Sequence, residues 1–368
     1  KLRIVAPPAP AGASFWFDCG FGVQIANSSD VTLSGFVQDY TAPCFAQGTV
    51  VDVGTRVGAT QWVDIRFDLE NFADPGNQTL FPWVAGSVPL DDVVTGGAPP
   101  VQVPTNHISV KATFWDSATT RMLAHGNHLV YNTTRLGNAD ADANVFRVTF
   151  RGPIVPTGKV QPGVLATVHY RLGLADPTTM RPVRTGQAGG LTFLITNSSR
   201  ITTLNHTLHG GGTEAIVEAG GEGGNIYRGV RVARREGRTP QRLLAANADG
   251  FHSSCVLNGP TLEDSEISWT GDDLLNIHSR ISIVLDVLSN KSAYIIDAEG
   301  VSAPGDYDES TLMLERTRPG DILAFFELGT MRPKGNGTIT ALRRVYRSEE
   351  HTSELQSRLH LVCRLLLE

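Results

Sequence analysis

Short apolar segments, separated by polar and glycine-rich turns, run through much of this chain. The clearest pattern is a repeat, in which residues 25–32 read IANSSDVT and residues 195–202 read ITNSSRIT. Each copy predicts a short strand, a polar Asn-Ser-Ser turn and a second strand. A unit of this size buries its apolar face only against neighbouring copies, so the repeat predicts the coils of a solenoid.

Further segments of the same kind follow the second copy. Their apolar positions lie at 215–217, 226–232, 250–253, 261–267, 274–278 and 281–285. The step from one coil to the next is about 22–26 residues, in the range of known solenoid repeats. Short strands at this spacing with polar turns predict a right-handed parallel β-helix.

Residues 46–190 follow a different pattern. Apolar and polar residues alternate strictly in segments such as 63–69, 108–114 and 145–150. Alternation gives a strand one buried and one wet face, which is typical of antiparallel pairing. The two Asn-Ser-Ser copies lie 170 residues apart, too far for adjacent coils without an insertion. We therefore expect an antiparallel β-barrel or sandwich to be inserted between them.

The patterns together predict an all-β chain: a right-handed parallel β-helix interrupted by an inserted antiparallel β domain. Residues 347–368 stand apart, because they lack glycine and proline and begin with RSEEHTSELQS, which a common sequencing adapter encodes. We interpret them as an artefactual tail; a genuine amphipathic C-terminal helix is the alternative. The expected parts are truncated N-terminal coils at 1–45, the inserted β domain at 46–190, coils with the candidate site at 191–288, a truncated second β domain at 289–346, and the tail at 347–368.

Composition narrows the classes of function. The 38 glycines and 20 prolines argue against a helical bundle, and the chain has no apolar run long enough for a membrane-spanning helix. A net charge of −6 without a basic block argues against nucleic-acid binding. Seven Asn-x-Ser/Thr sequons favour a secreted glycoprotein, although such pairs are also common in turns. We expect an extracellular location, with any signal peptide missing from this fragment.

Acidic residues gather in the stretch 247–278. Asp249 opens one predicted coil, and Asp272 with Asp273 opens the next. Neighbouring strands stack about 4.8 Å apart, so the three carboxylates should lie side by side. Carboxylates this close repel one another, which keeps one of them protonated. A protonated and an ionised carboxyl are what glycosidic cleavage requires, and an inverting pair usually lies ~6.5–9.5 Å apart. The alternative is that Asp-Gly and Gly-Asp-Asp only form turns.

These residues also carry a family resemblance. The pattern Asn247-x-Asp249-Gly-Phe-His252, followed one coil later by Asp272-Asp273-x-x-Asn276-Ile-His278, resembles glycoside hydrolase family 110. The resemblance implies a β-helix with β-barrel domains and an inverting, metal-free release of terminal α-linked galactose. It places the essential carboxylates on Asp249, Asp272 and Asp273. A more distant similarity to polygalacturonases makes Asp272 the acid, with Asp249 and Asp273 holding the water.

The remaining polar and aromatic residues of the stretch are candidates for sugar binding. Asn247, His252, Asn276 and His278 could hydrogen-bond sugar hydroxyls, and Trp269 could stack on a sugar ring. The alternative for Trp269 is a core aromatic residue.

We therefore predict an O-glycosyl hydrolase that needs no cofactor or metal and whose partner is a glycan. Two alternatives remain: a non-catalytic carbohydrate-binding β-helix, and another polysaccharide hydrolase or a calcium-dependent lyase. A lyase needs a basic residue beside its carboxylates. No Lys occurs between Lys159 and Lys291, so only Arg could serve. The sequence leaves open the oligomeric state and whether Cys19 and Cys44 pair.

Overall fold

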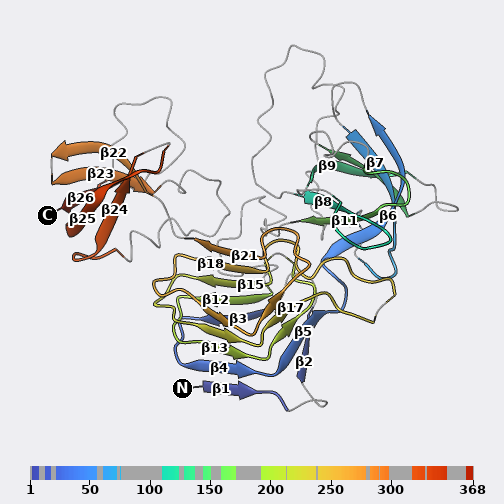
Figure 1. The fold of residues 1–368 in the computed structure, drawn as a ribbon, viewed down its shortest axis with the longest axis horizontal. Helices are drawn as coiled ribbons and strands as arrows, with labels where there is room; N and C mark the ends of the chain where they lie inside the picture. The colour runs from blue at the N-terminus through green and yellow to red at the C-terminus, as the bar shows by residue number, and fades with distance from the viewer. Residues whose placement is uncertain are drawn as a thin grey trace, which may run out of the picture. The chain divides into compact units, whose positions relative to one another are not determined.

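The computed structural model shows an all-β protein, and the part of the chain it describes contains strands and no helix (Figure 1). The prediction of an all-β chain is confirmed. The chain divides into two compact units, Lys1–Ile277 and His278–Glu368. The structure describes residues 2–7, 13–17, 22–55, 61–72, 75, 110–123, 128–136, 144–150, 159–170, 192–212, 214–237, 239–278, 282–289, 291–297, 317–327, 330–345 and 362–367.

Three five-stranded sheets with parallel pairing occupy the first unit. In spatial order the first is β1 (Leu2–Val5), β4 (Val31–Ser34), β13 (Thr202–Leu204), β16 (Ile226–Arg228) and β19 (Thr261–Glu263). The second is β2 (Ala13–Phe17), β5 (Phe36–Tyr40), β14 (Thr207–Leu208), β17 (Arg231–Val232) and β20 (Glu266–Ile267). The third is β21 (Leu275–His278), β18 (Phe251–Ser254), β15 (Ile216–Ala219), β12 (Phe193–Thr196) and β3 (Val23–Ala26). The chain visits the three sheets in turn, a path compatible with the predicted β-helix.

The two Asn-Ser-Ser copies are neighbours in space. Ile25 pairs with Ile195 in the third sheet, and Thr32 pairs with Thr202 in the first. The backbone N–H of Ser28 donates to the Ser198 hydroxyl across 170 residues of sequence. The repeat therefore stacks copy on copy, and the chain between the copies leaves the sheets and returns to the same register.

The step between stacked strands is not uniform. The Asn225 side chain accepts a hydrogen bond from the backbone N–H of Ile201, 24 residues earlier, as predicted. The next step is 35 residues, as the Ser253–Glu218 hydrogen bond shows. The expected spacing of 22–26 residues is therefore wrong here, because the extra segment 233–246 lies between β17 and β18.

Apolar side chains from all three sheets share one core. The largest contributors are aromatic residues, and the cluster includes Phe36, Phe193, Tyr227 and Phe251, all at most 5% exposed. The alternating inward positions of short strands supply these residues, which explains why no single strand needs to be long.

The chain between the two repeat copies forms a closed antiparallel barrel. Its strands are β6 (Phe45–Thr55), β7 (Gln61–Phe67), β8 (Val110–Trp115), β9 (His128–Arg135), β10 (Val145–Phe150) and β11 (Leu165–Tyr170), in the order β10-β7-β6-β11-β8-β9. The apolar residues of the alternating pattern fill the interior of the barrel: Val63, Ile65 and Phe67 are all buried in the same cluster. Part of the predicted inserted domain, such as 171–190, lies outside the described residues.

The barrel is joined to the parallel sheets by apolar and polar contacts. Phe45 and Trp115 of the barrel pack with Leu243 and Leu244 of the segment 233–246. The Gln47 side chain donates to the Gln241 carbonyl and accepts from the Leu243 N–H.

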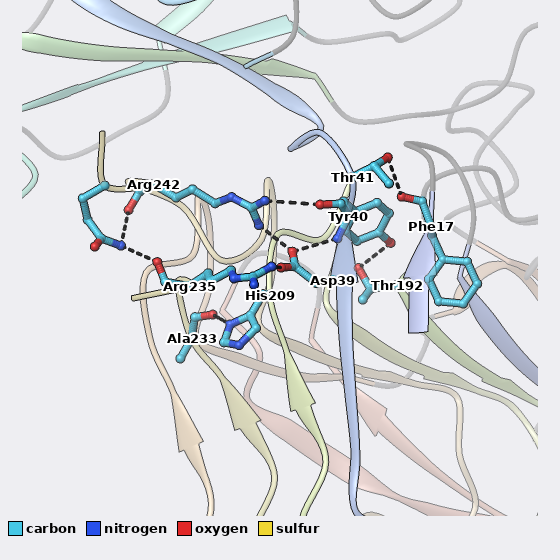
Figure 2. A network of polar contacts seen from close by, with 10 residues as sticks. Phe17, Asp39, Tyr40, Thr41, Thr192, His209, Ala233, Arg235 and Arg242 are labelled. Carbon is cyan, nitrogen blue, oxygen red and sulfur yellow. Dashed lines mark hydrogen bonds and ion pairs between the residues drawn. The ribbon is translucent and has the colours of Figure 1, made fainter. Parts of the chain in front are cut away.

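A buried charge network strengthens the same junction (Figure 2). The Asp39 carboxylate, next to the end of β5, binds the guanidinium groups of Arg235 and Arg242. Asp39 and Arg242 are almost fully buried, and Arg242 also donates to the Tyr40 carbonyl. Segment 233–246 is therefore held to the strand that leads into the barrel.

The second unit contains one antiparallel sheet. The prediction that residues 281–285 belong to a further coil is wrong, because residues 282–289 pair antiparallel within this sheet. Its strands are β22 (Ser282–Ser289), β23 (Ser292–Asp297), β26 (Val362–Leu367), β25 (Pro333–Val345) and β24 (Ile322–Phe326), in this spatial order. β26 falls in the predicted artefactual tail, so residues 362–367 form a strand there, and residues 347–361 lie outside the described residues. That residues 347–368 derive from an adapter stays a prediction.

A search of the described residues for a helix long and apolar enough to cross a membrane finds none.

Candidate active site

The structure brings the three predicted aspartates together at one end of two neighbouring strands. Asp249 precedes β18, and Asp272 and Asp273 precede β21. The Gly250 N–H donates to the Asp273 carbonyl at 2.8 Å, which fixes the two turns against each other. One carboxylate oxygen from each of the three residues lies within 4.8 Å of the other two.

The cluster extends from the surface into the protein. Asp272 and Asp273 are exposed, whereas Asp249 is buried. The expected spacing of ~6.5–9.5 Å for an inverting pair is wrong here, because the oxygens lie within 4.8 Å of one another, nearer the ~5–5.5 Å of a retaining pair. The physical reason is the short distance between adjacent strands, about 4.8 Å, which sets the spacing of side chains at equivalent positions.

Two predicted sugar-binding residues contact the buried aspartate, and their contact with a sugar stays a prediction. His252 Nδ1 lies 2.7 Å from Asp249 Oδ2, and the Asn276 amide donates to the same oxygen at 3.3 Å. When Asp249 is ionised it only accepts hydrogen bonds, and His252 Nδ1 then carries the hydrogen in this pair. Both contacts fix the orientation of Asp249.

A fourth carboxylate, Glu214, belongs to this group and was missed by the sequence analysis. It is buried, and one of its oxygens lies within 4.8 Å of atoms of both Asp249 and His252. Glu214 comes shortly before β15, the strand next to β18. The signal that could have found it is the 35-residue step between these strands, which places Glu214 one coil before Asp249.

The barrel contributes a basic residue that the sequence analysis also missed. Lys111 of β8 places its Nζ atom 2.9 Å from Asp272 Oδ2. The expectation that only Arg could supply a positive charge here is therefore wrong. The absence of Lys between Lys159 and Lys291 did not exclude a lysine at the site, because Lys111 comes from the inserted domain, 161 residues before Asp272 in the chain.

His169 of β11 lies beside Lys111 in the wall of the barrel that faces the aspartates. The two residues are register partners on adjacent barrel strands, and His169 is buried with neither ring nitrogen hydrogen-bonded among the described residues. Burial, with a smaller effect from the Lys111 charge, lowers the pKa of His169 to about 3. His169 is therefore neutral at physiological pH.

Gly271, immediately before Asp272, lies against this wall. A Cβ at position 271 would lie 2.3 Å from the Asn247 carbonyl oxygen and 3.2 Å from His169 Nε2. Only glycine lets the turn that carries Asp272 approach so closely. The barrel and the turn thus meet directly beside the carboxylates.

Two other predicted binding residues have structural contacts. The buried Asn247 amide donates to the carbonyls of Cys44 and Gly212 and so ties three chain segments together. The Arg234 guanidinium carbon lies 3.6 Å from the Trp269 ring centroid, and Trp115 packs nearby at 6.4 Å between ring centroids. One face of Trp269 is therefore covered, which fits the alternative of a core aromatic residue better than a platform for sugar.

His278 is the last residue of β21 and begins the second compact unit. Its sugar contact stays a prediction. The sequence left open whether Cys19 and Cys44 pair. Cys44 is disulfide-bonded, and Cys19 lies outside the described residues.

Two overlapping groups of side chains offer atoms that could hold a metal ion. One is Glu214, Asp249 and His252, and the other is the three aspartates. Carboxylate oxygens suit Ca²⁺ or Mg²⁺, and an added imidazole suits transition metals. The same oxygens can equally donate and accept protons, so the donor set does not by itself decide between the two chemistries.

No model of a known protein family matches the chain, and a search of curated proteins finds no similar sequence. The resemblance to glycoside hydrolase family 110 therefore rests on the motif residues alone.

Proposed function

We propose that the three parallel sheets form a right-handed parallel β-helix and that the chain is an inverting glycoside hydrolase. Its substrate is a glycan with a terminal α-linked galactose. The observation that carries the proposal is the approach of the Asp249, Asp272 and Asp273 carboxylates to within 4.8 Å of one another at the ends of adjacent strands. The choice of galactose and of inversion rests on the family resemblance alone, and the short carboxylate spacing does not support inversion.

The different surroundings of the carboxylates support different roles. Following the similarity to polygalacturonases, we assign the exposed Asp272 the role of proton donor. Asp249 is buried and held by His252 and Asn276, which suits a carboxylate that must stay fixed while it accepts a proton from water. Asp273 completes the pair that positions this water.

The bond changes balance with these groups alone. Asp272 gives its proton to the glycosidic oxygen as the bond from that oxygen to the anomeric carbon breaks. Water attacks the anomeric carbon from the opposite face, and its proton passes to Asp249 or Asp273. The products are galactose of inverted configuration and the shortened glycan.

Single substitutions test the proposal. Asp249→Asn, Asp272→Asn and Asp273→Asn should each lower release of galactose from galactosyl-α-1,3-galactose by about 100-fold or more, the usual contribution of a general acid or base. Asp264→Asn is the matched control, because Asp264 occupies an exposed turn after β19 and Asn tolerates its positive φ of 48°. Full activity in all three site variants would overturn the proposal.

One observation favours a second candidate, a calcium-dependent polysaccharide lyase. Such an enzyme needs carboxylates around the cation and a basic side chain as proton acceptor, and Lys111 supplies the latter next to Asp272. A chelator separates the two candidates. The hydrolase should keep its activity in EDTA, and a lyase should lose it and regain it with added Ca²⁺.

We also propose that the protein is extracellular and glycosylated. Three sequon asparagines of the parallel sheets, Asn27, Asn197 and Asn205, are exposed at turns. Mass spectrometry of the protein secreted from a eukaryotic host should find glycan on at least one of them. An unmodified secreted protein would contradict this part of the proposal.

A further inference from the structure

The inserted barrel carries a charged side chain to the candidate acid. Lys111 Nζ lies 2.9 Å from Asp272 Oδ2, and the exposed fractions of the two side chains are 19% and 42%. A partly covered ion pair is screened less by solvent than a pair on an open surface. This contact joins two parts of the chain that the sequence separates by 161 residues.

The position of Lys111 is fixed by its surroundings. Its register partner His169 is buried and neutral, so Lys111 has no competing charge on that neighbouring strand at this position. The Gly271 turn lies against His169, which brings Asp272 to the barrel wall. Apolar packing of Phe45 and Trp115 on Leu243 and Leu244 holds the barrel in place.

We propose that Lys111 is a positioning residue of the site, which holds Asp272 and stabilises the negative charge that develops there during proton transfer. The inference rests on the proposed function, in which Asp272 donates its proton to the leaving oxygen. The carboxyl group must carry a proton for this step and is anionic after it, and the ion pair with Lys111 in the structure corresponds to the anionic form. A fixed ammonium group 2.9 Å away therefore favours the transition state over the ground state.

This role predicts a dependence on the leaving group. A sugar leaving group is basic and needs the proton from Asp272, whereas fluoride leaves with little help from an acid. Lys111→Met should lower kcat for galactosyl-α-1,3-galactose by about 100-fold, with little change in KM, as when one preorganised electrostatic donor is removed. The same variant should hydrolyse α-galactosyl fluoride at a rate close to that of the wild-type protein.

Two further variants serve as controls. Lys111→Arg keeps the charge and should restore most of the lost kcat. Lys159→Met removes an exposed lysine of the same barrel and should leave both substrates unaffected. A similar loss of activity on both substrates would show that Lys111 has a purely structural role. Full activity of Lys111→Met on the disaccharide would show that Lys111 has no role in catalysis. Either result would overturn the inference about Lys111 and leave the proposed function standing. A wild-type protein that hydrolyses neither substrate overturns the proposed function as well.

Discussion

Asp249 and His252 face each other across the start of β18, with Asp249 Oδ2 2.7 Å from His252 Nδ1. Both side chains are largely covered, and the Asn276 amide contacts the same oxygen at a longer distance, 3.3 Å. The shorter contact therefore has the greater part in orienting the buried carboxylate.

Replacing His252 should impair catalysis through Asp249. His252→Phe removes the donor and leaves a buried carboxylate less well paired, so kcat should fall by about 100-fold, as expected for a displaced catalytic group. Gln can still donate a hydrogen bond to Asp249, so the kcat of His252→Gln should fall less than that of His252→Phe. Steady-state kinetics of both variants test this order, and equal activity of the Phe variant and the wild-type protein would contradict it.

His169 should make the protein less stable in acid. Its pKa is about 3 in the folded protein and about 6.5 in the unfolded chain, so it contributes fully to stability above pH ~6.5. Below that pH the unfolded chain takes up a proton that the folded protein does not. The free energy of unfolding should then fall by ~1.4 kcal/mol per pH unit until pH ~3.

Chemical denaturation at several pH values measures this effect. His169→Phe should reduce the slope of stability against pH by one proton in this range. Burial lowers the pKa of His206 to about 4. His206→Phe should therefore reduce the slope of stability against pH in a similar way, but only down to pH ~4. An unchanged slope in His169→Phe would show that the imidazole is already protonated in the folded protein.

Gly271→Ala should disturb the turn that carries two of the aspartates. The new Cβ would lie 2.3 Å from the Asn247 carbonyl oxygen, and backbone must move to relieve the contact. Overpacking of this kind costs about 1–3 kcal/mol of stability. Gly259→Ala is the control, since a Cβ there meets no atom within 4 Å. Equal unfolding midpoints for the two variants would contradict the close approach.

The buried Asp39 should be far more important for stability than an exposed carboxylate in a similar pair. Asp39→Asn leaves the buried Arg242 without its anionic partner, which should cost about 3–5 kcal/mol. The exposed pair of Asp30 and Arg200 is the comparison, and Asp30→Asn should leave the unfolding midpoint nearly unchanged. Similar midpoints for the two variants would contradict the account of the junction.

Sequence patterns predicted the strands well because each depends on local alternation and turns. The in-register pairing of Ile25 with Ile195 follows directly from the repeat, and the convergence of the aspartates follows from their places at successive strand starts. Glu214 escaped prediction because the 35-residue step broke the expected spacing. Lys111 escaped because its place beside Asp272 depends on how the barrel packs on the sheets, which no local pattern encodes.

The role of Trp269 also could not be predicted from local sequence patterns. An aromatic residue in a polar stretch suggests a sugar platform, but Arg234 of the extra segment lies over its ring. Contacts between segments that are distant in sequence therefore decide which side chains of the stretch remain available to a ligand.

The stereochemistry of the first product tests the central claim most directly. Proton NMR of α-galactosyl fluoride, which releases a single galactose, distinguishes the two anomers of that galactose during hydrolysis by the wild-type protein before they interconvert. The account predicts that β-galactose appears first, because water attacks opposite the leaving group in a single displacement. The first appearance of α-galactose would contradict inversion, and the release of no galactose would contradict the proposed function.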